Sequence, residues 1–364
     1  MKKVLLFSVI ILLTAGFLLI PSKATEAKHD TDTFSLPVVG SAENLKKQLS
    51  SYISSEQLYR DMEDITITNK MTQAAAPERS AAGNSDYSTT NIQVQGVDEA
   101  DIIKTDGKYI YQVAEQHIMI INAVPPNKMK VIKQLSFNEE RFSPQELFVD
   151  EKYLIVIGSS YENIPLDYLS PLSKNIKIYP PYRTQQKVKA VVFDISNKND
   201  IKQIREVELS GNYVSSRKIG SNLYLVANQR IDYYHIMEQD ECPNQPFYRD
   251  SAAEKDCRFV DFKKIYYFPE CIVPNYLVLA GLNLEKPDET VNVSAYLGSG
   301  ENIYATEKSL YAAVTNSRTV QPRPLKNDIT GSILPLESPR LETTIYRFTL
   351  DQGKIKFVKK GTVP

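Results

Sequence analysis

The residues best suited to chemistry form a short acidic group ahead of a series of predicted strands. Asp98, Glu99 and Asp101 place three carboxylates within four residues. Because Ca²⁺ takes several oxygen ligands, this group could hold a calcium ion, although its spacing is not that of an EF-hand loop. The same side chains could instead accept hydrogen bonds from backbone amides of a turn before the next strand. Both interpretations stay open, and calcium is the one possible cofactor that the sequence suggests.

Residues for nucleophilic catalysis are sparse. The chain has three histidines, His29, His117 and His235, and it lacks motifs of the GxSxG, HExxH, P-loop and GxGxxG types. The polar stretch Ser215–Arg217 has no histidine close to it in the sequence, which favours a turn with an exposed arginine. The sequence therefore predicts no catalytic residue.

Three cysteines, Cys242, Cys257 and Cys271, fall within thirty residues of one another. In an exported protein this number favours one disulfide and one remaining thiol. A zinc site is the weaker alternative, because no CxxC pair is present and His235 is the only nearby imidazole. We expect a disulfide between two of the three, without specifying the pair.

Aromatic residues concentrate in the stretch 232–274. They are Tyr233, Tyr234, Phe247, Tyr248, Tyr266, Tyr267 and Phe268. Tyrosine-rich loops on a rigid fold suit contact with an extracellular protein or polysaccharide. These side chains could instead form a small satellite core around the disulfide.

All of these residues must be positioned by short strands, and the strands repeat. Four similar segments are each preceded by one short strand and followed by two more. The composition, with 22 tyrosines and no tryptophan, also suits strands. A unit of four antiparallel strands that recurs is typical of β-propeller blades, whereas a β-sandwich does not repeat one strand order. The sequence predicts an all-β propeller over 91–364. The expected blades are 102–135, 146–209, 214–297 and 302–359.

Extra residues collect between the second and third strands of the units. The first unit has a tight turn at 114–116, whereas the others have longer connections at 160–187, 228–274 and 316–342. In a propeller these connections emerge on one face of the disc, where insertions either mark a binding face or cover the channel mouth.

The N-terminus has the layout of a secretory signal peptide over 1–24. Lys2 and Lys3 precede an apolar run over 4–20, and small residues follow at the expected cleavage site. An uncleaved signal anchor is the alternative, and it would be the only contact with a membrane. We expect a secreted or cell-surface protein. The signal is followed by a polar region over 25–70, which contains a helix at about 41–62, and then by a flexible linker over 71–90.

The segment Thr90–Tyr111 resembles the opening of a family of secreted bacterial and archaeal β-propeller-domain proteins that are distantly related to WD-40 repeats. Further matching blocks are 211–217, 266–269, 343–348 and 361–364. The resemblance implies a propeller fold and an extracellular location but supplies no catalytic site. In such proteins more blades follow the last block, so we expect the four blades to be part of a larger ring and the chain to be a fragment.

Two functions remain from these observations. A net charge of −1 with 24% charged residues argues against broad affinity for nucleic acid or an anionic membrane. The leading hypothesis is a non-catalytic binding scaffold outside the cytoplasm. The alternative is an extracellular, hydrolase-like enzyme with an acidic or metal site at the channel mouth, formed by Asp98, Glu99 and Asp101.

Overall fold

The structure is a computed structural model that describes most of the predicted propeller region. The described residues are 35–50, 52, 94–138, 141–165, 182–232, 236, 245–298, 300, 302–318 and 340–363. The predicted signal peptide and linker lie outside them. A helix begins as expected, with residues 42–50 helical, and the rest of the predicted helix except residue 52 lies outside the described residues.

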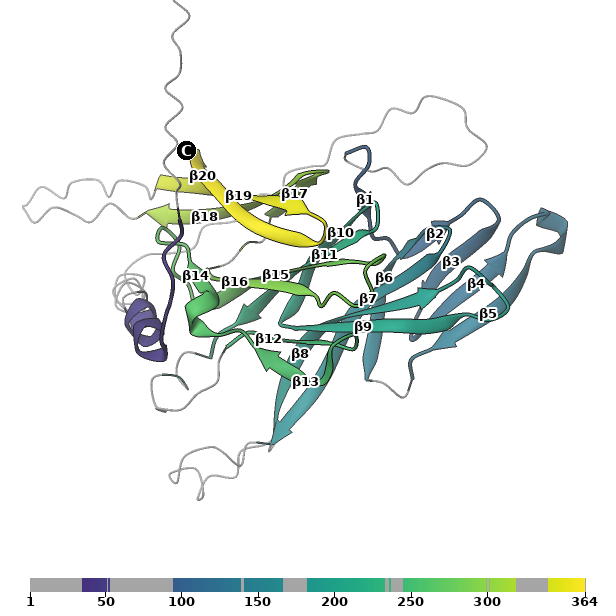
Figure 1. The fold of residues 1–364 in the computed structure, drawn as a ribbon, viewed down its shortest axis with the longest axis horizontal. Helices are drawn as coiled ribbons and strands as arrows, with labels where there is room; N and C mark the ends of the chain where they lie inside the picture. Colours follow the sequence, from purple (N-terminus) through teal and green to yellow (C-terminus); the bar gives the residue numbers. More distant parts are fainter. Residues whose placement is uncertain are drawn as a thin grey trace, which may run out of the picture. The chain divides into compact units, whose positions relative to one another are not determined.

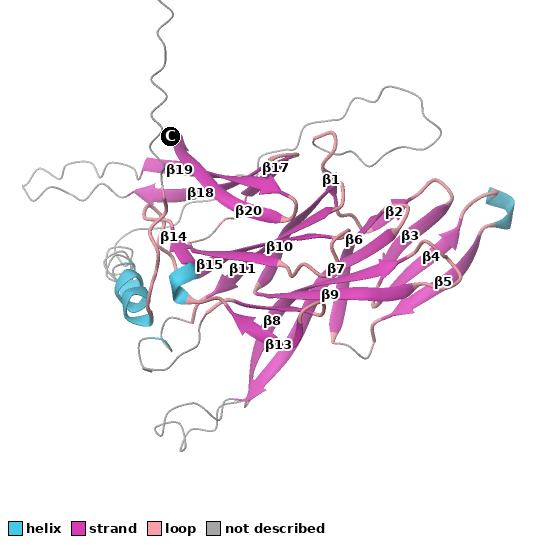
Figure 2. Cartoon of the chain, viewed as in Figure 1, coloured by secondary structure: helices cyan, strands magenta, loops and turns pink. Residues whose placement is uncertain are grey.

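Strands dominate the described residues, as Figure 2 shows. The sequence favours this because β-branched and aromatic side chains fit the pleated surface of a sheet. Two 3-10 turns, Pro126–Lys128 and Phe262–Lys264, interrupt the strands. In the described part of the chain, no helix has the length and apolar character needed to cross a membrane.

The first and fourth sheets each have four antiparallel strands in chain order (Figure 1). The first sheet consists of β2 (Ile103–Thr105), β3 (Tyr109–Ala114), β4 (His117–Asn122) and β5 (Lys130–Ser136). The fourth sheet consists of β17 (Asn302–Thr306), β18 (Ser309–Arg318), β19 (Arg340–Asp351) and β20 (Lys354–Val363). Both match the predicted four-strand blades.

The second and third sheets contain the same four-strand unit with additional strands at their edges. The unit of the second sheet is β6 (Phe142–Val149), β7 (Tyr153–Pro165), β8 (Tyr182–Asp194) and β9 (Lys202–Ser210). The unit of the third sheet is β10 (Asn212–Ile219), β11 (Asn222–Arg230), β15 (Asn275–Asn283) and β16 (Asn292–Leu297). The predicted all-β fold of four-stranded antiparallel blades is confirmed.

The long insertion of the third unit, 228–274, supplies most of the additional strands. Its strands β12 (Phe247–Asp250) and β13 (Glu254–Phe259) extend the second sheet beyond β9. Its strand β14 (Ile265–Tyr267) lies parallel to β16 at the outer edge of the third sheet, while β1 (Asp98–Glu99) pairs with β10 at the inner edge. The insertion therefore ties two neighbouring blades together.

Three hydrophobic clusters join the sheets in chain order. The first and second sheets share a cluster that includes Tyr111, Ile118 and Leu154. The second and third sheets share the largest cluster, and the third and fourth share another that includes Tyr224 and Phe348. Because successive side chains of a strand point to opposite faces, each middle sheet contributes one face to each of two clusters.

The segment around the N-terminal helix packs on the third blade. Leu45 and Leu49 are buried in the cluster between the second and third sheets, one helical turn apart. Before the helix, the Val39 amide donates to the Ile265 carbonyl at 2.8 Å, and the Tyr267 amide donates to the Pro37 carbonyl at 3.0 Å. This segment is part of the folded unit that spans Ser35–Pro364.

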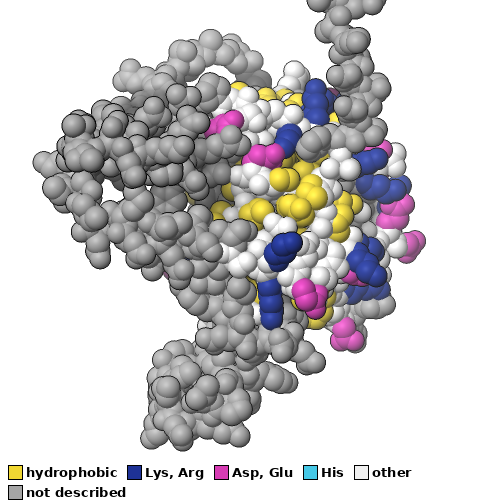
Figure 3. Space-filling view, turned by 90° about the vertical axis from the view of Figure 1, so that its left-hand side faces the viewer, with side chains coloured by type: hydrophobic (Ala, Val, Ile, Leu, Met, Phe, Trp, Pro, Cys, Tyr) yellow, Lys and Arg dark blue, Asp and Glu magenta, His cyan; other side chains and the backbone are white. Residues whose placement is uncertain are grey.

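The surface carries charges of both signs. On the face drawn in Figure 3, hydrophobic side chains gather in the described area, and Lys or Arg and Asp or Glu side chains surround them. On this face the charges are mixed, in agreement with the net charge of −1.

Candidate functional site

The acidic group lies at the inner edge of the third sheet, where its first two carboxylates are paired with cations. Asp98 Oδ1 accepts a hydrogen bond from Lys104 Nζ at 2.7 Å. Glu99 Oε1 lies 3.1 Å from Arg217 Nη2, because β1 and β10 pair with these two residues opposite each other. The negative charge of both carboxylates is therefore balanced within the fold.

The third carboxylate caps a turn. Asp101 Oδ1 accepts a hydrogen bond from the Ile102 amide at 2.7 Å, and the Asp101 backbone bridges to Leu147 of the second sheet. No group of three or more His, Cys, Asp or Glu side chains that could hold a metal ion occurs in the described ranges. Asp101 thus accepts a hydrogen bond from a backbone amide, as the capping interpretation expects, whereas Asp98 and Glu99 form ion pairs with side chains.

The stretch Ser215–Arg217 belongs to a polar link between the second and third sheets. The Tyr213 hydroxyl donates to Glu146 Oε2 at 2.6 Å and lies 2.8 Å from the Ser216 hydroxyl, which is buried. Burial and the nearby Glu146 carboxylate raise the pKa of Tyr213. A phenol held in its neutral form does not take a proton from Ser216, and the Glu146 carboxylate hydrogen bonds to Tyr213, so that the three side chains link two sheets.

The aromatic residues of the predicted binding face differ in their exposure. Phe247 and Phe268 are buried, and Tyr248 and Tyr267 pack against the cluster between the second and third sheets. A binding face requires side chains that are exposed at the surface, and those of Phe247 and Phe268 are not. Tyr266 is partly exposed, and Tyr233, Tyr234 and His235 lie outside the described residues.

Phe268 shows why the aromatic insertion is buried. Its ring stacks on Tyr346 of the fourth sheet with centroids 3.9 Å apart and on Tyr296 of the third sheet at 5.4 Å. The insertion therefore contributes to the packing between two blades.

The cysteines are dispersed. Cys257 is exposed on β13, whereas Cys271 is buried in the cluster between the third and fourth sheets. These two do not form a disulfide with each other. Cys242 lies outside the described residues, so a disulfide that involves it stays a prediction.

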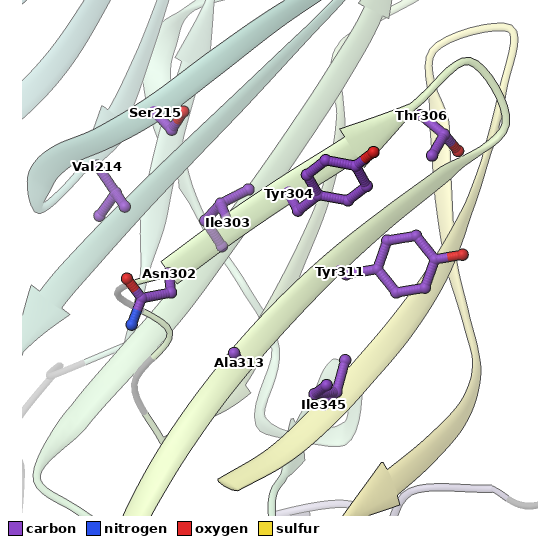
Figure 4. A pocket seen from close by; sticks show the side chains of 9 residues that line it. All are labelled: Val214, Ser215, Asn302, Ile303, Tyr304, Thr306, Tyr311, Ala313 and Ile345. Carbon is purple, nitrogen blue, oxygen red and sulfur yellow. The ribbon is translucent and has the colours of Figure 1, made fainter. Parts of the chain in front are cut away.

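A feature that the sequence did not reveal is a hollow beside the inner strands of the third and fourth sheets. Its volume is about 570 Å³, and residues of β10, β17, β18 and β19 line it. Figure 4 shows the side chains of Tyr304 and Tyr311 next to each other, on adjacent strands. Their ring centroids are 6.1 Å apart, and Tyr304 is 46% exposed.

The hollow lies at the inner edge of the fourth sheet, where Val214 and Ser215 of the third sheet also line it, and most of its fourth-sheet residues belong to the outer face of that sheet, the face turned away from the third sheet. Leu310, Ala312 and Tyr346 point into the cluster with the third sheet and are buried. Alternation along the strands places Tyr311 and Ile345 on the opposite face, where both remain partly exposed. The repeat in the sequence could have identified this face, because Tyr311 aligns with Tyr224 and each of the two tyrosines follows a buried leucine.

The chemical character of the hollow is apolar and aromatic with a polar margin. Val214 and Ile345 contribute hydrocarbon, and Asn302 and Ser215 contribute polar groups at its edge. The Ser215 hydroxyl accepts a hydrogen bond from Arg217 Nη1 at 2.7 Å. Such a surface can bind a partner by burying tyrosine and aliphatic groups.

Two curated relatives are similar to part of the chain. An uncharacterized protein of Methanocaldococcus jannaschii is 29% identical over 213 residues, which cover 56% of this chain and 28% of the relative. An uncharacterized protein of Archaeoglobus fulgidus is 24% identical over 245 residues, which cover 62% of this chain and 32% of the relative. The aligned part is thus less than a third of the length of each.

The fold and the family comparison agree. No solved structure matches the chain. The family model described as a beta propeller domain matches residues 87–364, the region that contains all four sheets. The chain therefore belongs to the beta propeller domain family.

Proposed function

We propose that this propeller is a non-catalytic binding scaffold that acts outside the cytoplasm, and that the outer face of its fourth sheet binds a protein. The observation that carries the proposal is the pair Tyr304 and Tyr311, which lie side by side on an apolar sheet face next to a hollow of about 570 Å³. A rigid sheet holds both rings in place, so little side-chain entropy is lost on binding.

A protein fits this surface better than a polysaccharide. The cores of protein interfaces are enriched in tyrosine and depleted of charged residues, and the hollow is lined by Val214, Ala313 and Ile345 together with the two tyrosines. On the same face, Arg347 of β19 lies directly opposite Tyr311, and Lys359 of β20 lies opposite Arg347. An apolar centre with a charged margin is the usual arrangement of a protein interface.

The alternative, an extracellular hydrolase-like enzyme, has less support. Its acidic group is engaged in contacts with Lys104 and Arg217 and in the turn before β2. The buried Ser216 has a neutral tyrosine as its neighbour. Location outside the cytoplasm rests on the signal-like sequence over 1–24 and on the resemblance to secreted proteins.

The test uses the immobilised full chain and a secreted-protein fraction as the probe, with retained proteins purified and titrated individually. The proposal predicts that a purified partner binds the wild type and that Tyr304→Ala together with Tyr311→Ala weakens its affinity at least about tenfold, as expected for tyrosines at the centre of an interface. Tyr161→Ala is the matched control, because Tyr161 is an exposed tyrosine of the second sheet. Equal affinity for all three proteins would exclude this face.

A further inference from the structure

The N-terminal segment, residues 35–50, lies outside the four-strand units and outside the region 87–364 that the family model matches. It nevertheless belongs to the folded unit that spans Ser35–Pro364. Residues 51–93 separate the segment from β1, so it reaches the third blade from a distance in the sequence. The segment is therefore an addition to the propeller that is joined to it by contacts of its own.

The first part of the segment extends the third sheet at its outer edge. The outermost strand of that sheet is β14, and two backbone hydrogen bonds between β14 and the segment flank an antiparallel bridge between Val38 and Tyr266. A third bond runs from the Gly40 amide to the Phe262 carbonyl at 2.9 Å. Addition of an extended chain to a sheet edge is a common mode of peptide recognition, in which main-chain hydrogen bonds give affinity.

The side chains of the segment add a second mode of binding. Leu36 is buried in the cluster between the third and fourth sheets, and Val39 is buried in the cluster between the second and third. Leu45 and Leu49 of the helix are buried in that same cluster. Residues four apart lie on one face of a helix, so these two leucines form an apolar stripe of the kind that docks on an apolar surface.

The surface that accepts the segment is built by the long insertion of the third unit. The turn Phe262–Lys264 and β14 provide the backbone partners, and Ile236 and Ile265 are buried in the cluster that receives the helix. Neither the insertion nor the segment belongs to the four-strand unit of a blade. The two parts of the chain that the repeat does not explain thus bind each other.

The start of the helix is stabilised within the segment. The Asn44 amide donates to Ser41 Oγ at 3.2 Å, and Asn44 Nδ2 donates to the Val39 carbonyl at 2.8 Å. The first of these bonds satisfies an amide that a helix start leaves without an intrahelical partner. Because both bonds are internal, the segment can leave the third blade without breaking them.

We propose that the outer edge of the third blade is a recognition site for short amphipathic segments and that residues 35–50 are its tethered, exchangeable ligand. The recognised pattern is an extended stretch with apolar residues three apart, Leu36 and Val39, followed by a helix with two leucines four apart. A tether keeps its ligand at an effective concentration on the order of 1 mM, so a free segment competes poorly until the tethered one is weakened or released. This site shares no residue with the hollow at the fourth sheet, so failure of one proposal leaves the other intact.

Fluorescence anisotropy of a labelled peptide with the sequence of residues 35–50 tests the proposal on the full chain. Leu45→Asp together with Leu49→Asp in the chain places carboxylates at two positions that are 1% exposed, which should release the tethered segment. The peptide is expected to bind this variant at least about tenfold more tightly than it binds the wild type. A peptide that carries the same two substitutions should bind neither protein.

Glu43→Ala together with Lys47→Ala is the matched control, because both side chains are exposed on the same helix. This control variant should bind the peptide as weakly as the wild type does. Circular dichroism verifies that the blades of each variant are folded. A folded variant with both leucines replaced that does not bind the peptide, or a wild type that binds it equally tightly, would overturn the proposal.

A second measurement leaves the segment itself unchanged. The wild-type chain is cut at a protease site introduced into the predicted linker over 71–90, and excess labelled peptide is then added. The cut N-terminal piece should be replaced by the peptide while the blades stay folded. A piece that the peptide does not replace, or blades that unfold once the piece has left, would show that residues 35–50 are a fixed part of the core and not an exchangeable ligand.

Discussion

Among single residues, a buried ion pair connects the second and third blades. Arg205 on β9 contacts Asp250 on β12 through two hydrogen bonds of 3.0 and 2.7 Å, and both side chains are almost fully buried. Arg205 also donates to the Glu289 carbonyl, and the Val291 amide donates to Asp250, each at 2.7 Å. The pair therefore fixes the inserted strand β12 to both sheets.

Removal of the arginine leaves a buried carboxylate without its cation. We expect Arg205→Met to lower the free energy of unfolding by about 3–5 kcal/mol, the usual cost of breaking a buried pair. Lys202→Met is the control, because Lys202 is 68% exposed in its ion pair with Asp200 and should cost at most about 1 kcal/mol. Urea unfolding measures both, and equal losses would contradict a special role for the buried pair.

The same carboxylate makes stability depend on pH. Burial alone would raise the pKa of Asp250, but the hydrogen bonds from Arg205 and from the Val291 and Ala252 amides outweigh burial and hold the pKa below its ordinary value. A lowered pKa stabilises the fold fully above the ordinary value of about 3.9, and this stabilisation is lost as pH falls through the folded-state pKa. Unfolding at a series of acidic pH values should therefore show that wild type and Asp250→Asn converge; a constant difference would contradict this linkage.

For single residues the sequence was a poor guide to the site. Asp98, Glu99 and Asp101 stood out because three carboxylates are close in the chain, yet the fold pairs them with Lys104, Arg217 and a backbone amide. Arg217 comes from a strand far away in the sequence, and no local pattern identifies such a partner. The tyrosines at the hollow were missed because tyrosine occurs throughout the chain.

Among the strands and loops, the long insertion and the hairpin turns decide how the blades differ. In each of the first two sheets, the two innermost strands form a hairpin. Four residues lie between the last two residues that pair across it, as between Val149 and Leu154. In the third and fourth sheets only two do, as in Ile219 and Asn222. Although the repeat aligns Tyr153 with Leu223, Tyr153 faces the third sheet, which follows its own, whereas Leu223 faces the second sheet, which precedes its own. The strands themselves were predictable, but turn length and the strands within the insertion were not.

The insertion should stabilise the contact between the third and fourth sheets. Phe268→Ala removes a fully buried ring that stacks on Tyr296 and Tyr346, so we expect a loss of about 3–5 kcal/mol in the free energy of unfolding. Phe259→Ala, in the same insertion but 53% exposed, should cost less than about 1 kcal/mol. Similar costs for both variants in urea unfolding would mean that the insertion is not part of the core.

At the scale of the whole molecule, the described part of the chain is a series of four blades whose order followed from the sequence. Self-similarity of four-strand units survives differences in loop length, because each blade must present two apolar faces to its neighbours. The faces that remain exposed, at Tyr304 in the fourth sheet and Val131 in the first, could not be predicted. Exposure depends on what covers a face, and the pattern within one strand does not specify that.

The most direct test of the central claim, that the outer face of the fourth sheet binds a protein, is oxidative footprinting of the full chain with and without its partner. Oxidation of Tyr304 and Tyr311 is expected to slow when the partner is bound, while oxidation of Tyr161, an exposed tyrosine on β7, stays unchanged. Unchanged oxidation of Tyr304 and Tyr311 with protection elsewhere would contradict the account.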